Sequence, residues 1–314
     1  MANIGVRSPY FQSLSNVSGE YFKIEITINS TLRYTLTKVT PDEAHFEISE
    51  LIRDYINIEY NGTMPTNPAD SASGYSADVS LALKIYDNTA GTGTPISDTT
   101  VTFDAFDAYA FFEDQDKDYT LPSTAVLLTS KTIWLPENTA GVFYYTSLDV
   151  VTKYDIGTTT EGDVSVAGDT VTIRRFDCTK YDPIKVVFIN RYGMPQELWF
   201  FGKTIESSSY TSDQYKSANI TGAGVYSKYE HQYKKFDAKG KKKYIINTGF
   251  VSQDYNASID ELLMSEQSWM HIDSTVRPIN VLTADIDFRT SLNDKLVQYS
   301  LEIEQANDLI STMR

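Results

Sequence analysis

Short stretches of alternating polar and apolar residues recur along the chain. From Phe22 to Ile28 every second residue is a large apolar one, and this period of two predicts a half-buried strand over Glu20–Ile28. Asn29-Ser30 predicts a turn, and Leu32–Val39 repeats the alternation. We therefore expect a β-hairpin close to the start of the chain.

A second pattern, two continuous apolar runs, lies within Ile184–Phe201. The runs Val186–Ile189 and Leu198–Phe201 are separated by a polar segment that contains Gly193 and Pro195. Short runs of β-branched and aromatic residues between turn residues are typical of strands buried on both faces. We expect a hairpin at the centre of a C-terminal domain, with core positions at Phe188, Trp199, Phe200 and, in a later strand, Tyr299.

Two segments change to a helical period. In Phe46–Ile58 the apolar residues fall on one helical face, with Ser49 as a candidate N-cap, and Asn256–Ser265 predicts a second short helix. Turn-forming residues at Asp237–Gly240 predict a turn between two paired strands. The strands expected elsewhere are Ala77–Tyr86, Thr99–Phe103, Ala108–Phe112, Leu127–Leu135, Val142–Thr146, Thr170–Phe176, Tyr229–Phe236, Lys243–Asn247, Trp269–Ile272, Val276–Asn280, Ala284–Phe288 and Leu296–Glu304.

These elements predict a mainly β protein, made of two antiparallel β-sandwich-like domains with two short helices. Residues 1–19 are largely polar, so we expect an extended N-terminal arm. Gly, Thr and Asp are frequent over residues 156–169, which is typical of a connecting segment. The boundary between an N-terminal β domain (20–165) and a C-terminal β domain (166–314) is expected there.

Composition narrows the classes of function. The 314 residues carry a net charge of −15, which opposes binding to nucleic-acid phosphates. No apolar run approaches the ~18–20 residues of a membrane span, and the N-terminus lacks the apolar core of a signal peptide. We expect a soluble protein made in a reducing cytoplasm, in which the single cysteine, Cys178, forms no intrachain disulfide.

The sequence offers no recognisable catalytic constellation. His45, His231 and His271 lie far apart without the spacing of a zinc site, and neither a phosphate-binding glycine motif nor a nucleophile elbow occurs. The nearest glycine-rich segment, Gly222-Ala223-Gly224, is expected to be a loop. Chance pairs of carboxylates are abundant among 42 acidic residues, so they do not indicate glycoside hydrolysis. We predict a non-enzymatic protein with no cofactor and no metal.

One acidic segment leaves an alternative open. Asp114, Asp116 and Asp118 have the alternating spacing that begins a Ca²⁺-binding loop. Such a loop then requires glycine, and Tyr119 follows here. We expect a solvated acidic turn, and a Ca²⁺ site is the alternative.

Interaction surfaces are the remaining candidates for function. A basic cluster stands out in this acidic chain, and it forms either a solvated hairpin tip or a contact with an acidic patch on a neighbouring subunit. Tyr is favoured in protein contacts, so we also expect contacts from the N-terminal arm and from loops at residues 61–76 and 217–227. The candidate interface residues are Ser8, Pro9, Tyr10, Phe11, Tyr75, Tyr226, Lys234, Lys235, Lys241, Lys242 and Lys243.

Three groups of segments, taken in order, resemble a known family. The first is SPYF at residues 8–11, followed by a hairpin and by FEISELIRDYI at 46–56. The second is VVFINRYGMPQELWFF at 186–201, and the third is YIINTGF, the short ELLMSE segment and NDKLVQYSLEIEQANDLI, which ends at residue 310. They resemble virion structural proteins of tailed bacteriophages of Bacteroidetes hosts, including crAss-like phages. Residues 61–180 contribute little to the resemblance.

The resemblance implies a tail or neck component that assembles with copies of itself and other virion proteins into a symmetric ring or baseplate-like complex. It also implies a location in the virion tail, after assembly in the host cytoplasm. No nucleic-acid or membrane partner is expected. The alternative is a carbohydrate- or receptor-binding module of a tail with a glycan partner, and a glycan hydrolase is a third, less supported class.

Overall fold

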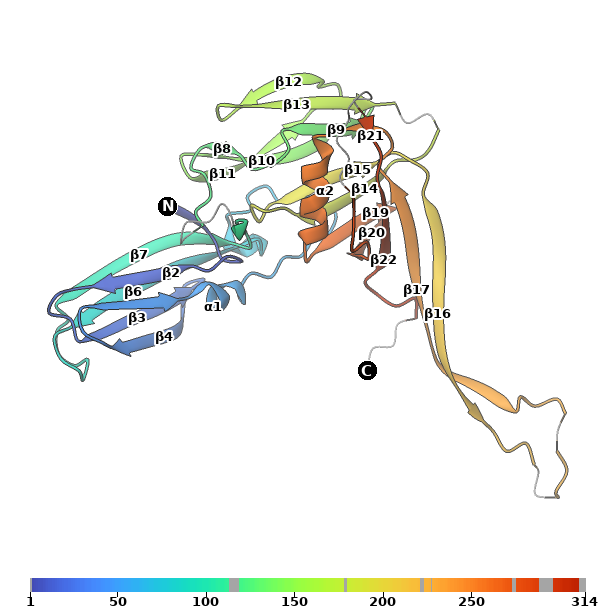
Figure 1. Cartoon of the computed structure of the whole chain (residues 1–314), viewed down its shortest axis with the longest axis horizontal. Coiled ribbons are helices and arrows are strands. Elements are labelled where there is room, and N and C mark those ends of the chain that lie inside the picture. The colour runs from blue at the N-terminus through green and yellow to red at the C-terminus, as the bar shows by residue number, and fades with distance from the viewer. Residues whose placement is uncertain are drawn as a thin grey trace.

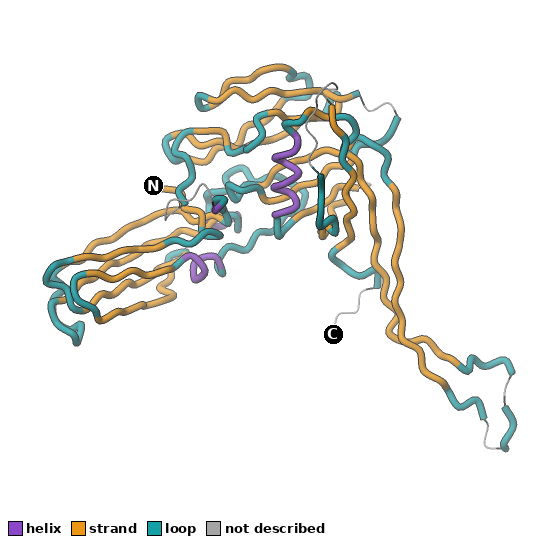
Figure 2. Tube along the Cα trace, viewed as in Figure 1, coloured by secondary structure: helices purple, strands orange, loops and turns teal. Residues whose placement is uncertain are grey.

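Among the residues that the structure describes, strands in several sheets predominate, and they are accompanied by two α-helices and a short 3₁₀ helix (Figure 1). The computed structural model describes residues 2–112, 119–177, 180–220, 223–226, 228–272, 275–287 and 296–310. An elongated sheet lies at the N-terminal end, and a long ribbon projects at the opposite end. Strands also dominate the region between them (Figure 2). The predicted mainly β, sandwich-like class with two helices is confirmed.

A five-stranded sheet in the order β1-β7-β6-β3-β4 forms the N-terminal part. β1 and β7 are parallel, and the other neighbours are antiparallel. The hairpin expected from the first alternating stretch is confirmed as β3 and β4. The elements of this part are β1 (Ala2–Gly5), β2 (Phe11–Ser15), β3 (Tyr21–Ile28), β4 (Thr31–Val39), β5 (Glu43–Glu47), α1 (Ser49–Arg53), the 3₁₀ helix η1 (Ser71–Ser73), β6 (Ser76–Tyr86) and β7 (Ser97–Phe106).

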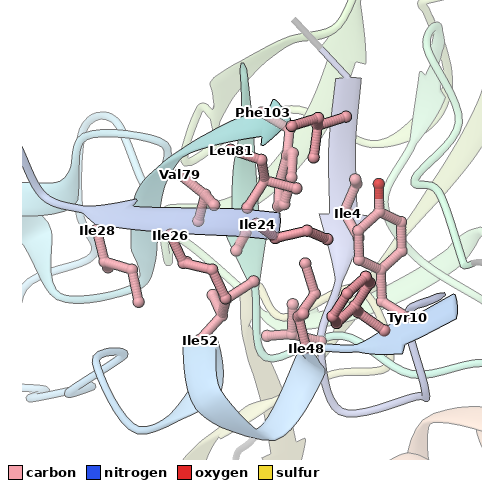
Figure 3. Packing of buried hydrophobic residues seen from close by; sticks show 14 of the residues in the cluster. Ile4, Tyr10, Ile24, Ile26, Ile28, Ile48, Ile52, Val79, Leu81 and Phe103 are labelled. Carbon is pink, nitrogen blue, oxygen red and sulfur yellow. The ribbon is translucent and has the colours of Figure 1, made fainter. Parts of the chain in front are cut away.

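The alternation in β3 separates a core face from an outer face. Ile24, Ile26 and Ile28 are fully buried, while the residues between them are partly exposed. Ile48 and Ile52, just before and within α1, pack in the same cluster (Figure 3). Burial of one such side chain contributes about 1.5–3 kcal/mol, so packing explains why a helix of five residues forms here.

The predicted N-terminal arm is instead part of this fold. β1 pairs with β7, and β2 pairs with β5. Four apolar residues of the first 19 are buried in the N-terminal core: Ile4, Val6, Tyr10 and Leu14. The partner of β1 begins only at Ser97, so the local pattern could not indicate the pairing. The prediction of an extended arm is wrong.

The first helix is shorter than expected, and the second matches its prediction. Ile48 occupies the N-cap position of α1, and the Ser49 backbone N–H donates to Glu47 Oε1 at 2.9 Å, so Glu47 supplies the cap in place of Ser49. The second helix, α2, covers Tyr255–Met264. None of the helices in the described ranges is long and apolar enough to cross a membrane.

Two three-stranded sheets form the middle part, in the orders β11-β10-β8 and β12-β13-β9. They enclose a core that includes Phe143, Val171 and Ile173. The boundary predicted between residues 165 and 166 falls within β12, whose hairpin partner is β13, so it divides a hairpin. The strands are β8 (Ala125–Val126), β9 (Thr132–Pro136), β10 (Gly141–Ser147), β11 (Val150–Ile156), β12 (Gly162–Val166) and β13 (Asp169–Phe176).

A seven-stranded sheet in the order β15-β14-β19-β20-β22-β17-β16 forms the C-terminal part. The hairpin expected over Ile184–Phe201 is confirmed as β14 and β15. Phe188, Phe200 and Tyr299 are buried as expected, whereas Trp199 is partly buried. The strands are β14 (Ile184–Ile189), β15 (Pro195–Phe200), β16 (Ile205–Lys216), β17 (Tyr233–Asn247), β18 (Val251–Ser252), β19 (Ser268–Ile272), β20 (Thr275–Val281), β21 (Leu296–Val297) and β22 (Ser300–Gln305).

Some expected strands differ from the structure. Residues 108–112 form a connection instead of a strand, fixed by the Tyr109 N–H, which donates to the Arg191 carbonyl at 2.9 Å. The two strands expected on either side of Asp237–Gly240 are one strand, β17. Residues 284–287 are not in a strand, and Phe288 lies outside the described residues.

The loop expected at residues 61–76 packs between the N-terminal and C-terminal parts. Met64 and Tyr75 are buried in a cluster with Val187 and Trp269. The Tyr144 hydroxyl donates to the carbonyl of Pro65, within the same loop, at 2.7 Å. This loop therefore makes contacts inside the chain.

Candidate interaction surface

A two-stranded ribbon projects from the C-terminal sheet (Figure 1). All twelve residues of β16 are exposed, and so are residues 233–239 of β17. β17 pairs with β22 over Lys243–Asn247, and in the described chain β16 is its one partner strand beyond that segment. An isolated two-stranded ribbon is only marginally stable in water, because it buries little apolar surface.

Gly240 marks the point at which the ribbon leaves the seven-stranded sheet. We call the chain without the ribbon the body. A Cβ atom at this residue would lie 2.8 Å from Cδ1 of Tyr210, and the Gly240 carbonyl accepts the Leu309 N–H at 2.8 Å. Just beyond it the register shifts, and Asp237 has a φ of 47°. The turn-forming residues are therefore accommodated as a bulge within a continuous strand. We name residues 210–239 the distal ribbon.

The basic cluster is divided by Gly240 and does not form a hairpin tip. On the body side, three consecutive lysines form ion pairs with neighbouring strands: Lys241 with Glu304 at 3.3 Å, Lys242 with Glu206, and Lys243 with Glu302 at 3.4 Å. Lys234 and Lys235 lie on the distal ribbon and are exposed. Neither has an ion-pair partner among the residues that the structure describes, so within the basic cluster these two lysines are available to a partner.

Aromatic side chains are exposed along the distal ribbon. Tyr215 and Phe236 contact each other edge to face with ring centroids 5.8 Å apart, and each is 49% exposed. Tyr215 lies directly opposite Lys234, so these three side chains share one face. Further exposed rings are those of Tyr210, Tyr226, Tyr229 and Tyr233. Exposed aromatic residues beside cations are typical of protein contacts.

The ladder continues into the tip of the ribbon. The Ser217 N–H donates to the Gln232 carbonyl at 2.7 Å, and Asn219 Nδ2 donates to the Glu230 carbonyl at 3.1 Å. Between them lies a hollow of about 570 Å³, lined in part by Tyr226. The described residues of the loop predicted over 217–227 therefore contribute to this hollow.

Three candidate interface residues are buried within the chain. Ser8 accepts the Ala110 N–H on its hydroxyl at 3.0 Å, Tyr10 packs edge to face on Phe103, and Tyr75 lies in the cluster beneath the 61–76 loop. Because their side chains are already buried within the chain, they are internal residues and not interface residues. The candidates that the structure leaves exposed are Pro9, Phe11, Tyr226, Lys234 and Lys235.

The described residues hold no obvious metal site. Asp114, Asp116 and Asp118 lie outside them, so the Ca²⁺ alternative stays a prediction. Within them, no three His, Cys, Asp or Glu side chains gather as a metal ion would require. His271 is hydrogen-bonded to the Tyr60 hydroxyl at 2.8 Å, and burial, together with the nearby Lys185, lowers the pKa of its imidazole to about 4.

Glu261 on α2 is a buried carboxyl group. It is 2% exposed, the Thr129 hydroxyl donates to one of its oxygens, and the other oxygen has no hydrogen-bond partner in the described chain. Burial raises the pKa of this carboxyl to about 7. A catalytic acid or base must reach the substrate, and this group is closed off from the surface. Its position indicates a role in the core.

A hollow of about 380 Å³ lies beside the ends of β13, β15 and β17. Phe250, which is 60% exposed, forms one wall next to the stacked rings of Phe176 and Phe201, whose centroids are 4.5 Å apart. The polar part of the lining holds Asp177, Lys180 and Lys203, together with the amides of Asn247 and Gln298, which hydrogen-bond each other at 2.8 Å. Apolar walls with a few polar groups are typical of small-molecule sites.

Comparison of the chain with protein-family models, with curated proteins and with solved structures gives no match. The sequence patterns marked Tyr226, Lys234 and Lys235 as contacts, but they did not reveal the long ribbon that carries them. A further signal was Ile205–Lys216, twelve residues rich in Ser and Tyr without an apolar face. Such a segment suits a strand exposed on both sides.

Proposed function

We propose that this chain is a non-enzymatic structural protein of a tailed-phage virion, which assembles with its neighbours through the distal ribbon. The single observation that carries the proposal is the ribbon itself, exposed on both faces, with an aromatic pair beside Lys234. The resemblance of three groups of segments to virion proteins supports the phage context, as part of a tail or neck ring or a baseplate-like complex.

The ribbon contributes little to the stability of one chain. The residues that attach β17 to the C-terminal core, Tyr244 and Ile246, lie on the body side of Gly240. Ordering the residues beyond Gly240 costs about 1–2 kcal/mol of backbone entropy for each residue, and their exposed side chains recover little of it. A partner that covers the rings would offset this cost, because specific interfaces bury about 1,200–2,000 Å² in total.

Incorporation into particles tests the proposal. In a ribbon-less variant, Asn-Gly replaces residues 211–239 and joins Tyr210 to Gly240, which lie directly opposite each other. Asn-Gly suits a two-residue hairpin connection. We expect this variant to fold and to be missing from particles, and we expect Tyr215→Ser with Phe236→Ser to reduce incorporation.

The matched control is Leu148→Ser with Val150→Ser, which removes two exposed apolar side chains from the β10–β11 hairpin. This control should be incorporated like the wild type. Incorporation of the ribbon-less variant at the wild-type level would contradict assembly through the ribbon. Absence of the wild-type chain from purified particles would contradict the virion role.

The hollow beside Phe250 favours a second candidate, a glycan-binding module. Its exposed ring suits the apolar face of a sugar, and Asp177, Lys180 and Lys203 in the lining supply hydrogen-bonding groups for the sugar hydroxyls. Calorimetric titration with oligosaccharides would then show binding that Phe250→Ala abolishes. No binding at millimolar sugar would remove this candidate.

A further inference from the structure

The distal ribbon has two open edges, and they differ in how they are protected. β16 is the last strand of the seven-stranded sheet, so its outer edge has no partner strand among the described residues (Figure 1). The opposite edge belongs to β17, which beyond Gly240 carries three lysines and the bulge at Asp237. Lysines and bulges are devices by which proteins prevent an edge strand from pairing with another chain. The distal edge of β17 is therefore protected against strand addition.

The outer edge of β16 lacks this protection. The strand covers the twelve residues Ile205–Lys216, whereas an average strand has about five or six. It contains no proline, its one lysine is its last residue, and the extra residue of the bulge lies in β17. Residues 207–212 are uncharged. A long, regular edge with little charge is a template for the addition of another strand.

Backbone geometry identifies the residues that face the open edge. In an antiparallel ladder, the N–H and C=O groups of one residue point to the same side of its strand, and successive residues alternate. The Ser217 N–H donates to the Gln232 carbonyl, so residue 217 points toward the opposite strand of the ribbon. The Gly240 carbonyl accepts a backbone N–H from the C-terminal segment, so Tyr210, which lies directly opposite Gly240, points away from β17. Both observations assign the open edge to the even-numbered residues of 206–216.

We propose that the open edge of β16 pairs in antiparallel orientation with the same edge of a second copy of this chain, about a two-fold axis at Thr211. The inference rests on the proposed function, because it names the partner of the same ribbon. The even-numbered residues of the two β16 strands then exchange backbone hydrogen bonds. The two ribbons become one four-stranded sheet, which supplies the further strands that an isolated two-stranded ribbon needs for stability.

The side chains of β16 support this register. Glu206 lies opposite Lys216 of the second copy at both ends of the contact, and no like charges are opposed. Each of the two tyrosines of β16 lies opposite a serine, as Tyr215 lies opposite Ser207. An axis at Tyr210 would instead oppose two tyrosine rings and separate the charge pairs. The register at Thr211 therefore matches large side chains with small ones and acids with bases.

The charge pairs add specificity to a contact that the backbone holds. Glu206 already pairs with Lys242 of its own chain, and 49% of its side chain stays exposed. A carboxylate accepts several hydrogen bonds on its two oxygens, so it can also accept one from Lys216 of the second copy. In strand addition the main-chain hydrogen bonds supply most of the affinity.

The proposed contact is isologous, because the same edge is used by both copies. An isologous two-fold contact closes at a dimer. A ring or a baseplate-like complex would therefore join such dimers through other surfaces. An extended segment of another virion protein is the alternative occupant of this edge, and the experiments below separate it from a second copy.

Cysteine cross-linking tests the partner and the register together. Cys178 is first replaced by serine, so that each variant carries a single thiol. Thr211→Cys should give a disulfide-linked dimer under mild oxidation, because residues opposed at a non-hydrogen-bonded position have Cα atoms about 4.5 Å apart. Ser209→Cys is the matched control, since it shares that face but is offset from its copy by roughly 13 Å along the strand. Equal cross-linking of both variants, or none of Thr211→Cys, would overturn the register.

Removal of one outward N–H group tests the edge itself. Ser208 points to the open edge, so Ser208→Pro removes a donor that is not used in pairing with β17. We expect the dissociation constant for self-association to rise roughly a hundredfold or more, because the dimer loses the bond twice and the ring blocks the approach. Ser208→Ala keeps the N–H group and should associate like the wild type. Association of folded Ser208→Pro at the wild-type level would overturn the edge contact.

The inference and the proposed function fail in different ways. A wild-type chain that stays monomeric at all concentrations in analytical ultracentrifugation would overturn the second copy as partner. Normal incorporation of Ser208→Pro into particles, together with loss of the ribbon-less variant, would overturn the edge contact and leave assembly through the ribbon intact. Circular dichroism and the free energy of unfolding of each variant verify that it is folded before association is measured.

Discussion

The two ends of β17 belong to one strand but have different surroundings. On the body side of Gly240, β17 has β22 on one edge and β16 on the other, and Tyr244 and Ile246 are buried. Beyond Gly240 the same strand has β16 as its partner and is exposed on both faces. Among the residues that the structure describes, the distal end has no third strand beside it and no core.

This difference separates residues that fold the chain from residues that are available to a partner. Tyr244 is held by its burial and by Arg277 Nη1, which donates to its hydroxyl at 3.2 Å. Phe236 has the Tyr215 ring as its aromatic neighbour and is half exposed. Substitutions at the two ends should therefore have separable effects on stability and on assembly.

Hydrogen exchange should show the largest contrast. In the monomer, amides of the distal ribbon open locally with a small free energy, whereas those paired with β22 approach the global free energy of unfolding. We expect exchange on the order of a hundredfold faster or more for residues 213–216 and 233–236 than for residues 243–247. Mass spectrometry of peptides from the two ends measures this ratio. Equal protection in a monomeric sample would show that the ribbon is stable without a partner.

Truncation of the buried ring should produce the next largest effect. Tyr244→Ala removes a fully buried aromatic side chain from the C-terminal core. We expect a loss of about 3–5 kcal/mol in the free energy of unfolding, from lost burial and from the cavity that remains. Urea denaturation measures the loss. A change below about 1 kcal/mol would mean that this end of β17 does not anchor the strand.

The free energy of unfolding should also depend on pH, because the carboxyl group of Glu261 is buried. The pKa of Glu261 rises from 4.5 to about 7 on folding, so the folded state loses stability as pH rises through this range. Glu261→Gln keeps an acceptor for Thr129 and removes the charge. Relative to wild type, its free energy of unfolding should increase by about 2–3 kcal/mol between pH 5 and pH 8. Denaturation curves at both pH values measure this change. If the free energies of unfolding of the variant and the wild type differed by the same amount at both pH values, the pKa shift of Glu261 would be contradicted.

The smallest effect on stability is expected on the distal ribbon. Phe236→Ala should change the free energy of unfolding by less than about 0.5 kcal/mol, because the ring is half exposed and outside the core. The same variant should weaken self-association in sedimentation. A large loss of stability without any change in association would reverse the roles assigned to the two ends.

Local patterns revealed the elements whose partners lie close in sequence. Alternation from Phe22 to Ile28 was sufficient for the β3–β4 hairpin, because burial on one face requires a period of two. The apolar runs of Ile184–Phe201 likewise indicated β14 and β15, whose turn is short.

The local patterns could not predict contacts between segments that are distant in sequence. Ser8 and Tyr10 looked like parts of a polar arm because their cover comes from β7 and from residue 110. Asp237 and Gly240 have the residue types of a turn, and the bulge in β17 uses the same conformational freedom without reversing the chain. Exposure of the ribbon follows from the absence of a third strand among the described elements, which a sequence pattern does not encode.

The mass of the chain in solution tests the central claim most directly. Native mass spectrometry of the wild type and the ribbon-less variant, at matched concentrations, compares two chains that differ only beyond Tyr210 and Gly240. We predict a defined oligomer for the wild type and a folded monomer for the ribbon-less variant. The same mass state for both chains would contradict assembly of copies through the distal ribbon.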